Sequence, residues 1–244
     1  MKIIKLDATE STNTFLRELC HVDAIDNFTV VTAKKQTNGR GQMESSWSSN
    51  SGENLTFSVL VKFLDIELVD QFYISKAVAL SISDVLTSKL TTKVLVKWPN
   101  DILAEHKKIC GVLIENSVKK ARINHSIIGV GLNVNQVVFE NLPNATSMKL
   151  ISKEKYDLDK LLRQIVEILK KYIEIINQKD FHLIDKLYLD RLYKFNTPAM
   201  YKDVISGELF MGKLVDVTKE GLLKIELENE KTHKFNLKEI EFMR

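Results

Sequence analysis

VLVKWPND, residues 94–101, runs from an apolar strand into a proline turn and opens the part of the chain that decides the fold. Two more apolar runs follow it, ICGVLIE at residues 109–115 and IIGVGLNV at residues 127–134, and both are bounded by turn residues. Upstream, residues 55–63 have strand chemistry, and apolar residues then recur at helical spacing through residues 68–86. Several strands and one long helix in a single span predict an α+β sheet.

The flanking segments extend this pattern. The expected elements are a strand at residues 3–6, a helix that Ser11-Thr12-Asn13 can cap, a strand at residues 28–33 and an amphipathic helix from Asp157 to about residue 176. Residues 36–54 are polar, contain glycine and have no periodicity. We interpret them as a long functional loop.

Residues 197–244 have a different pattern of hydrophobic and turn residues. Short alternating segments are separated by turns at Ser206-Gly207 and Glu220-Gly221, which is the pattern of a small antiparallel β-barrel. Pro198 disfavours helix in the residue before it, so a boundary is expected near residue 196. The sequence therefore predicts a domain of residues 1–196 followed by a small domain of residues 197–244.

Composition narrows the class of protein. The 244 residues are 44% hydrophobic, which is too apolar for a disordered chain. The 35 basic and 32 acidic side chains are interspersed and give a net charge of +3, which argues against a dedicated nucleic-acid-binding protein. Two cysteines occur, Cys20 and Cys110, and neither has the spacing of a metal site, so a reducing compartment is expected.

The N-terminus does not look like a targeting segment. Charges at Lys2, Lys5, Asp7 and Glu10 break up the apolar stretch that a signal peptide requires. No segment approaches the ~20 uninterrupted apolar residues of a membrane helix. We therefore expect a cytoplasmic protein that has no membrane partner.

The first cluster with chemical character is QTNGRG at residues 36–41, directly after a predicted strand. Glycines on both sides of Arg40 let the backbone approach an anion, and the guanidinium can hold a carboxylate or phosphate through two parallel bonds. A flexible turn with a solvated arginine is the alternative, since Gly-x-Gly is common. Trp47 favours function, because a tryptophan in a hydrophilic loop usually covers something apolar; packing on a neighbouring strand is the alternative.

The second cluster is Lys97-Trp98-Pro99-Asn100-Asp101. Proline fixes the turn, so an amide, a carboxylate and a lysine are held together at the end of a strand. Asn-Asp after proline is also ordinary turn chemistry, so a purely structural turn is an equal alternative.

Two further clusters lie within predicted strands. Lys108 enters an apolar strand in which Gly111 indicates that a ligand or another backbone lies close, and a solvated lysine that protects a strand edge is the alternative. Gly129 and Gly131 bracket one valine and precede Asn133. One glycine could be a bulge, whereas two favour close approach.

In order and spacing these clusters resemble the biotin protein ligase family over about residues 9–135. The residues that carry the resemblance are Ser11-Thr12-Asn13, Gln36, Gly39-Arg40-Gly41, Trp47, Lys97-Trp98-Pro99-Asn100-Asp101, Lys108, Gly111, Gly129, Gly131 and Asn133. The resemblance implies an α+β fold with a mixed β-sheet and helices, related to class II aminoacyl-tRNA synthetases and lipoate ligases, plus a small C-terminal β-barrel domain. It also implies that biotin is joined to a lysine of an acceptor protein through biotinyl-5'-AMP, with ATP and Mg²⁺ required and no metal held by the protein alone.

The resemblance further implies roles for individual residues. Biotin would be bound by Ser11, Thr12, Asn13, Gln36, Gly39, Arg40, Gly41, Lys108, Gly111 and Gly129, the nucleotide by Arg40, Trp47, Asn100, Lys108, Leu132 and Asn133, and catalysis would depend on Arg40, Lys108 and Asp101. The cations suit the reaction, because a carboxylate must attack the α-phosphate of ATP and two anions meet. The resulting mixed anhydride hydrolyses if water reaches it, so the loop ending at Trp47 would cover the site.

The loop departs from the family's pattern, which reads Gly-Arg-Gly-Arg followed by glycine and a further arginine. Gln42 and Ser45 stand at two cationic positions and Glu44 at a glycine position. The reaction type is unaffected, and the expected difference lies in how well biotinyl-AMP is retained between the two steps.

Three other functions compete with this interpretation. A biotin-responsive DNA-binding repressor would need a helix-turn-helix before the catalytic domain, and Ser11 lies too near the start of this sequence to leave room for one. Lipoate or octanoate ligation fits the Gly39-Arg40-Gly41 and Lys97–Asp101 motifs less well, and a binding module without catalysis is the third. The expected partner is a biotin carboxyl carrier domain of a biotin-dependent carboxylase. No nucleic-acid partner is expected, and the family allows a homodimer.

Overall fold

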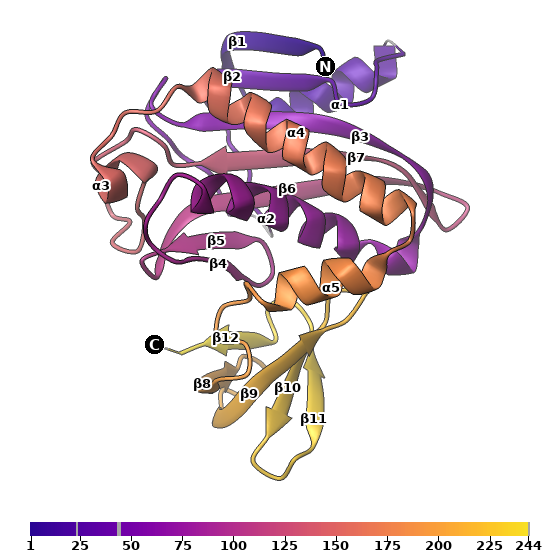
Figure 1. Ribbon diagram of the computed structural model, residues 1–244, viewed down its shortest axis with the longest axis vertical. Coiled ribbons are helices and arrows are strands. Elements are labelled where there is room, and N and C mark those ends of the chain that lie inside the picture. The colour runs from indigo at the N-terminus through magenta and orange to yellow at the C-terminus, as the bar shows by residue number, and fades with distance from the viewer. Residues whose placement is uncertain (23, 43–44, 244) are drawn as a thin grey trace.

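The computed structural model describes residues 1–22, 24–42 and 45–243. Its centre is a seven-stranded sheet with the order β1-β2-β3-β7-β6-β5-β4 (Figure 1). β1 and β2 pair in parallel and every other neighbouring pair is antiparallel, so the sheet is mixed and the α+β class is confirmed. The strands are β1 (Ile3–Thr9), β2 (Val30–Gln36), β3 (Leu55–Glu67), β4 (Val94–Lys97), β5 (Asp101–Ala104), β6 (Lys107–Lys119) and β7 (Arg122–Leu132).

Helices pack on both faces of this sheet. α1 lies on one face, where Leu16 packs with Val31, Leu60 and Ile127 in a small separate core. α2 and α4 pack against each other on the other face, and α5 contacts the end of this pair nearest the second sheet (Figure 1). The helices are α1 (Thr12–Val22), the 3₁₀ helix η1 (Leu68–Asp70), α2 (Phe72–Thr87), α3 (Met148–Ser152), α4 (Leu158–Asn177) and α5 (Phe181–Leu189).

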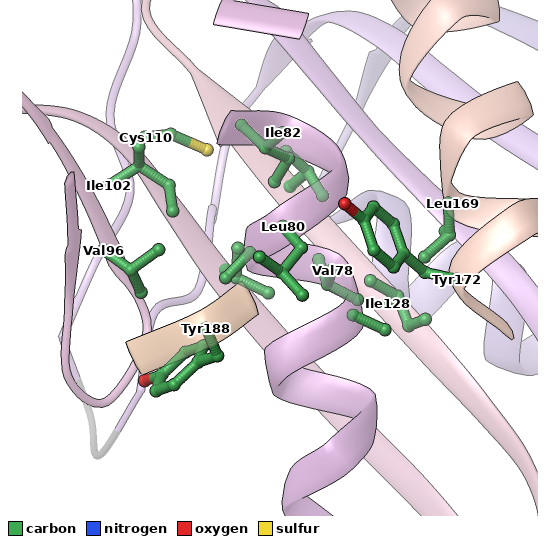
Figure 2. Close-up of a cluster of buried hydrophobic side chains, with 14 of the residues drawn as sticks. Val78, Leu80, Ile82, Val96, Ile102, Cys110, Ile128, Leu169, Tyr172 and Tyr188 are labelled. Atoms are coloured by element: carbon green, nitrogen blue, oxygen red, sulfur yellow. The ribbon is translucent and has the colours of Figure 1, made fainter. Parts of the chain in front are cut away.

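α4 begins where the sequence predicts. Asp157 Oδ1 accepts a hydrogen bond from the backbone N–H of Lys160 at 3.0 Å, which satisfies one of the free amides at the helix start. Its apolar stripe, including Leu169 and Tyr172, packs beside α2 in the main core (Figure 2). α2 is buried on almost every side, because α4, α5 and the strands β4 to β6 all contact it.

Residues 198–242 form a second, antiparallel sheet with the order β11-β10-β9-β8-β12. The predicted turns are present, and Gly207 and Gly221 both have positive φ. Trp98 Nε1 donates to the carbonyl of Gly221 at 2.9 Å, so this sheet is attached beside the turn that follows β4. No pairing between β11 and β12 closes the sheet among the described residues. The strands are β8 (Pro198–Asp203), β9 (Leu209–Val217), β10 (Leu223–Leu227), β11 (Thr232–Phe235) and β12 (Ile240–Phe242).

The structure adds elements that the sequence pattern does not predict. β5 and α3 are too short, at four and five residues, to show a period, and α5 follows α4 after a short turn. β6 and β7 continue beyond their apolar runs as a mostly polar hairpin, in which Ile123 and Ser126 of β7 are buried. Among the described residues, no helix combines the length and the apolar content needed to cross a bilayer.

Candidate functional site

A cavity lies where α1, the loop after β2, strand β6 and the end of strand β7 meet. Its lining brings together most of the residues expected to bind a ligand, although they are spread over more than a hundred positions of sequence. Those residues are Ser11, Thr12, Asn13, Gln36, Arg40, Gly41, Trp47, Asn100, Lys108, Gly111, Gly129 and Gly131. The four separate clusters therefore form one site.

Polar side chains are held in fixed orientations at the start of α1. Gln36 Oε1 accepts hydrogen bonds from the backbone N–H of Thr12 at 2.8 Å and from its hydroxyl at 3.1 Å. Behind them the fully buried Ser58 Oγ lies 2.7 Å from Thr12 Oγ1 and 2.6 Å from Asn13 Oδ1. The two α1 side chains thus bond across to β2 and β3, and the lining presents donors and acceptors at fixed points.

The paired glycines of β7 are required by close packing, as expected. A Cβ at Gly129 would lie 2.3 Å from Asn13 Oδ1, and a Cβ at Gly131 would lie 2.3 Å from Cε2 of Trp47. Both distances are far inside van der Waals contact, so no larger residue fits without movement. The ring of Trp47 therefore lies against the strand at Gly131, which is the packing on a neighbouring strand that the sequence left open as the alternative, and its role as a cover over a ligand stays a prediction.

Gly39 holds the loop against the same site. A Cβ there would lie 2.2 Å from the backbone oxygen of Trp47 and 2.8 Å from Nε2 of Gln36. The backbone N–H of Trp47 donates to the carbonyl of Gly39 at 2.8 Å. Gly39 does not line the cavity itself, and its contribution is to let two parts of the loop come together.

Arg40 points one edge of its guanidinium at a carboxylate that the sequence reasoning missed. Its Nη2 lies 3.1 and 3.2 Å from the two carboxylate oxygens of Glu115 on β6. Its Nε is buried and has no hydrogen-bond partner among the described residues. A buried donor without a partner carries a free-energy cost of about 1–3 kcal/mol, so this nitrogen is ready to bind a ligand acceptor.

Lys108, the second predicted cation, lies beside Asp101. Its Nζ is 2.7 Å from Asp101 Oδ1 and 6.0 Å from the ring centroid of Trp47. Its backbone is fixed on the other side, because its N–H donates to the carbonyl of Asn144 at 2.7 Å. Asn100 is pinned across the hairpin through its Nδ2, which donates to the carbonyl of Val112 at 2.8 Å.

A second cavity adjoins the first. It is lined by the segment 139–145 together with Ser46, Trp47, Ser48, Lys108 and Asn133. Trp47 and Lys108 line both cavities and so stand at their junction. Asn133 is buried, and its amide donates to the carbonyl of Thr146 at 3.0 Å, which holds the chain beyond this segment in place.

One predicted nucleotide contact is not supported. Leu132 is fully buried in the main core and lines neither cavity, because its side chain points to the opposite face of β7 from Gly131. Gln42 and Ser45 line the first cavity as neutral residues, whereas Glu44 lies outside the described residues.

The site offers neither a thiolate nor a preformed metal cage. Cys110 is fully buried under the sheet, and this burial raises the pKa of its thiol far above the usual range. Within residues 1–22, 24–42 and 45–243, no group of three or more His, Cys, Asp or Glu side chains could hold a metal ion. The cationic side chains that line the first cavity, among the described residues, are Arg40 and Lys108.

Comparisons with known proteins agree with this geometry. The family model described as the biotin/lipoate A/B protein ligase family matches residues 6–133. The chain is 30% identical over 229 residues to the bifunctional ligase/repressor BirA of Bacillus spizizenii, covering 92% of this chain and 69% of that protein. It is 29% identical over 168 residues to the biotin–[acetyl-CoA-carboxylase] ligase of Mycobacterium tuberculosis, covering 68% and 61%. The fold is similar to that of the Aquifex aeolicus biotin protein ligase solved with biotin and ATP, with a TM-score of 0.79, 24% identity and coverage of 100% and 99%.

Proposed function

This chain belongs to the biotin/lipoate A/B protein ligase family, and we infer that it is a biotin–protein ligase. It activates biotin with ATP, forms biotinyl-5'-AMP and transfers the biotinyl group to a lysine of an acceptor protein. The relatives reported above are a bifunctional ligase/repressor and a biotin–[acetyl-CoA-carboxylase] ligase, and the Aquifex structure contains both biotin and ATP. The single observation that carries the residue assignments is the junction of two cavities at Lys108 and Trp47.

The first cavity is assigned to biotin. A ureido ring needs both donors and acceptors, and Thr12, Asn13 and Gln36 supply them in fixed orientations. The glycines at 111, 129 and 131 let Asn13, Trp47 and Lys108 lie close to the sheet, so these side chains form the wall against which the ring and its chain would lie. The biotin carboxylate would then reach Arg40 Nε and Lys108 Nζ.

The second cavity is assigned to the nucleotide. Its lining from the segment 139–145 is mostly apolar, including Phe139, Leu142 and Pro143, which suits an adenine ring. The α-phosphate would lie at the junction, next to Lys108. Both reacting anions then meet beside the same cations, which lowers the barrier to carboxylate attack.

Mg²⁺ fits this donor set only as an ion that arrives with ATP. Mg²⁺ keeps several waters and is usually bound by one or two carboxylates plus substrate phosphates. Asp101 is the carboxylate beside the junction. To bind the ion it would have to break its ion pair with Lys108, or contact Lys108 and the ion at the same time. When bound, the ion supplies charge neutralisation at the phosphates.

The second step uses an acceptor lysine that attacks the acyl carbon as a neutral amine. We assign the removal of its proton to Asp101, which lies next to Lys108. The acceptor is a biotin carboxyl carrier domain of a carboxylase, encountered in the cytoplasm. Residues 1–196 would carry the catalysis, and residues 197–244 would form a separate small domain attached through Trp98 and Gly221.

Thermal melts with biotin and with lipoate test this function and its substrate. A ligand present at a hundred times its Kd adds about 2.7 kcal/mol of stability if only the native state binds it. For a chain of this size that corresponds to an increase in Tm of roughly 5–10 °C. We expect this increase with biotin and none with lipoate at equal concentration. An increase with lipoate alone would contradict the assignment.

Mass spectrometry of an isolated carrier domain checks the transfer itself. The domain should gain one biotinyl group on its target lysine when ATP, Mg²⁺ and biotin are all present. Replacement of the target lysine by arginine provides the matched control, since it removes the nucleophile and should abolish the mass increase.

A further inference from the structure

Glu115 is the centre of a charge cluster outside the predicted site residues. Three side chains from two other parts of the fold donate to its carboxylate. Asn13 Nδ2 lies 2.8 Å from Oε2, Arg17 Nη1 lies 3.1 Å from Oε1, and Arg40 Nη2 lies within 3.2 Å of both oxygens. The Glu115 side chain is 27% exposed, so these contacts are shielded from solvent more than ordinary surface pairs.

The contact between Glu115 and Arg40 leaves the Nε edge of the guanidinium without a partner among the described residues. Glu115 occupies Nη2 only, whereas the buried Nε has no partner among the described residues. An arginine side chain has several rotatable bonds and loses substantial entropy when it is fixed in one orientation. A carboxylate that fixes one edge therefore orients the other edge before the ligand arrives.

The charge balance of the cluster favours an anion at Arg40. One carboxylate faces two guanidinium groups, Arg17 and Arg40, so the cluster keeps an excess positive charge. Arg17 lines neither cavity and neutralises Glu115 from the side of α1. Glu115 can consequently hold Arg40 without cancelling its attraction for a carboxylate or a phosphate.

The same carboxylate also orients the predicted biotin-binding side chain on α1. Asn13 donates to Glu115 through Nδ2 and is bonded to Ser58 through Oδ1, so its amide cannot rotate. Glu115 thus links Asn13, at the α1 end of the cavity, to the guanidinium of Arg40.

We propose that Glu115 is a positioning residue that fixes Arg40 and Asn13 for biotin and for the developing adenylate. This inference rests on the proposed function, since it names a residue that acts through Arg40 on the same reaction. It makes Glu115 part of substrate selection without direct contact with the reacting atoms.

A double-mutant cycle on Glu115→Gln and Arg40→Gln tests the proposal. The readout is biotin-dependent exchange of pyrophosphate into ATP, with kcat and KM for biotin measured separately. Charged hydrogen bonds of this kind support an expected loss in kcat/KM of roughly ten- to a hundredfold for Glu115→Gln, mainly through a higher KM for biotin. In the Arg40→Gln background the second substitution should add less than about threefold, because the residue through which it acts is gone.

Arg17→Gln is the matched control. It removes another partner of the same carboxylate at a more exposed position and leaves the contact with Arg40 in place, so its loss in kcat/KM should be smaller than that of Glu115→Gln. A lower KM for biotin in Glu115→Gln would show that Glu115 competes with the ligand, and would overturn the proposal. Losses that multiply in the double variant, or an equal loss in Arg17→Gln, would also overturn it. If Glu115→Gln does not fold, Glu115→Asp replaces it in the same cycle, since the shorter carboxylate retreats from Arg40.

The experiment separates the two levels of inference. A wild-type enzyme that shows no biotin-dependent exchange would refute the proposed function. An active wild type with normal kinetics in Glu115→Gln would refute only the role of Glu115.

Discussion

Replacing Gly131 by alanine should displace Trp47 and impair biotin activation. The added Cβ would lie 2.3 Å from Cε2, 2.6 Å from Cζ2 and 2.7 Å from Cδ2 of the indole ring. Carbon atoms pack at about 3.5–4.0 Å, so the ring must move by more than about 1 Å. Trp47 belongs to a loop, whereas Gly131 is paired on both sides within the sheet, so the ring moves and the strand stays.

Overpacking of this kind costs about 1–3 kcal/mol. If the cost falls on the state in which Trp47 covers the ligand, kcat/KM for biotin should drop about 5- to 150-fold, since each 1.4 kcal/mol is about tenfold. The assay is pyrophosphate exchange at varied biotin concentration, accompanied by a thermal melt. Tm should change by only a few degrees, because the sheet itself is undisturbed.

Gly111→Ala is the matched control for Gly131→Ala. Its Cβ would lie 3.3 Å from Cζ3 of Trp47 and 3.3 Å from Cε of the flexible Lys108 side chain. These contacts can relax by a few tenths of an ångström, so its effect should be several times smaller than that of Gly131→Ala. Normal activity in Gly131→Ala, or a larger loss in Gly111→Ala, would refute the position of Trp47 described above.

Three further predictions address the cation, the loop and pH. Lys108→Ala should lower biotin-dependent pyrophosphate exchange by at least about a hundredfold. Lys107 is the exposed neighbour of Lys108, and the control variant Lys107→Ala should retain activity. Unchanged exchange in Lys108→Ala would remove this residue from the mechanism. With acceptor withheld, the wild type should release free biotinyl-AMP that chromatography can detect, and Gln42→Arg should reduce the amount; finding none in the wild type would contradict a weak cover. Burial and the nearby Lys62 lower the pKa of His125 in the folded state, so the unfolded chain binds more protons and the free energy of unfolding should fall as the pH drops below about 6.5. Denaturant titrations of wild type and His125→Gln across that range check this, and an unchanged pH dependence in the variant would refute it.

The sequence predicts the site better than it predicts the whole fold. Glycines and polar residues near strand ends constrain the backbone locally. The close approach at Gly129 and Gly131, and a packing role for Trp47, could therefore be predicted from the residues alone. The resemblance then joined clusters that no local pattern could join. The antiparallel order of β3, β7 and β6 brings them together, and this depends on contacts distant in sequence.

What the sequence could not predict has two physical origins. β5 and α3 are shorter than the window in which a period can be recognised. In the sequence, Glu115 ends an apolar run and looks like the solvated end of a strand. Its three partners are distant in sequence, on α1 and in the loop after β2, so no local pattern indicates them. Leu132 adjoins Gly131 in the sequence, but alternation along β7 turns its side chain into the core.

A crystal structure with biotin and a non-hydrolysable ATP analogue tests the central claim most directly, namely that two basic side chains bring two negatively charged reactants together. We expect the biotin carboxylate and the α-phosphate to meet at the junction of the two cavities, each within about 3.2 Å of a nitrogen of Arg40 or Lys108. Ligands bound elsewhere, or both side chains turned into bulk solvent with the ligands in place, would contradict it.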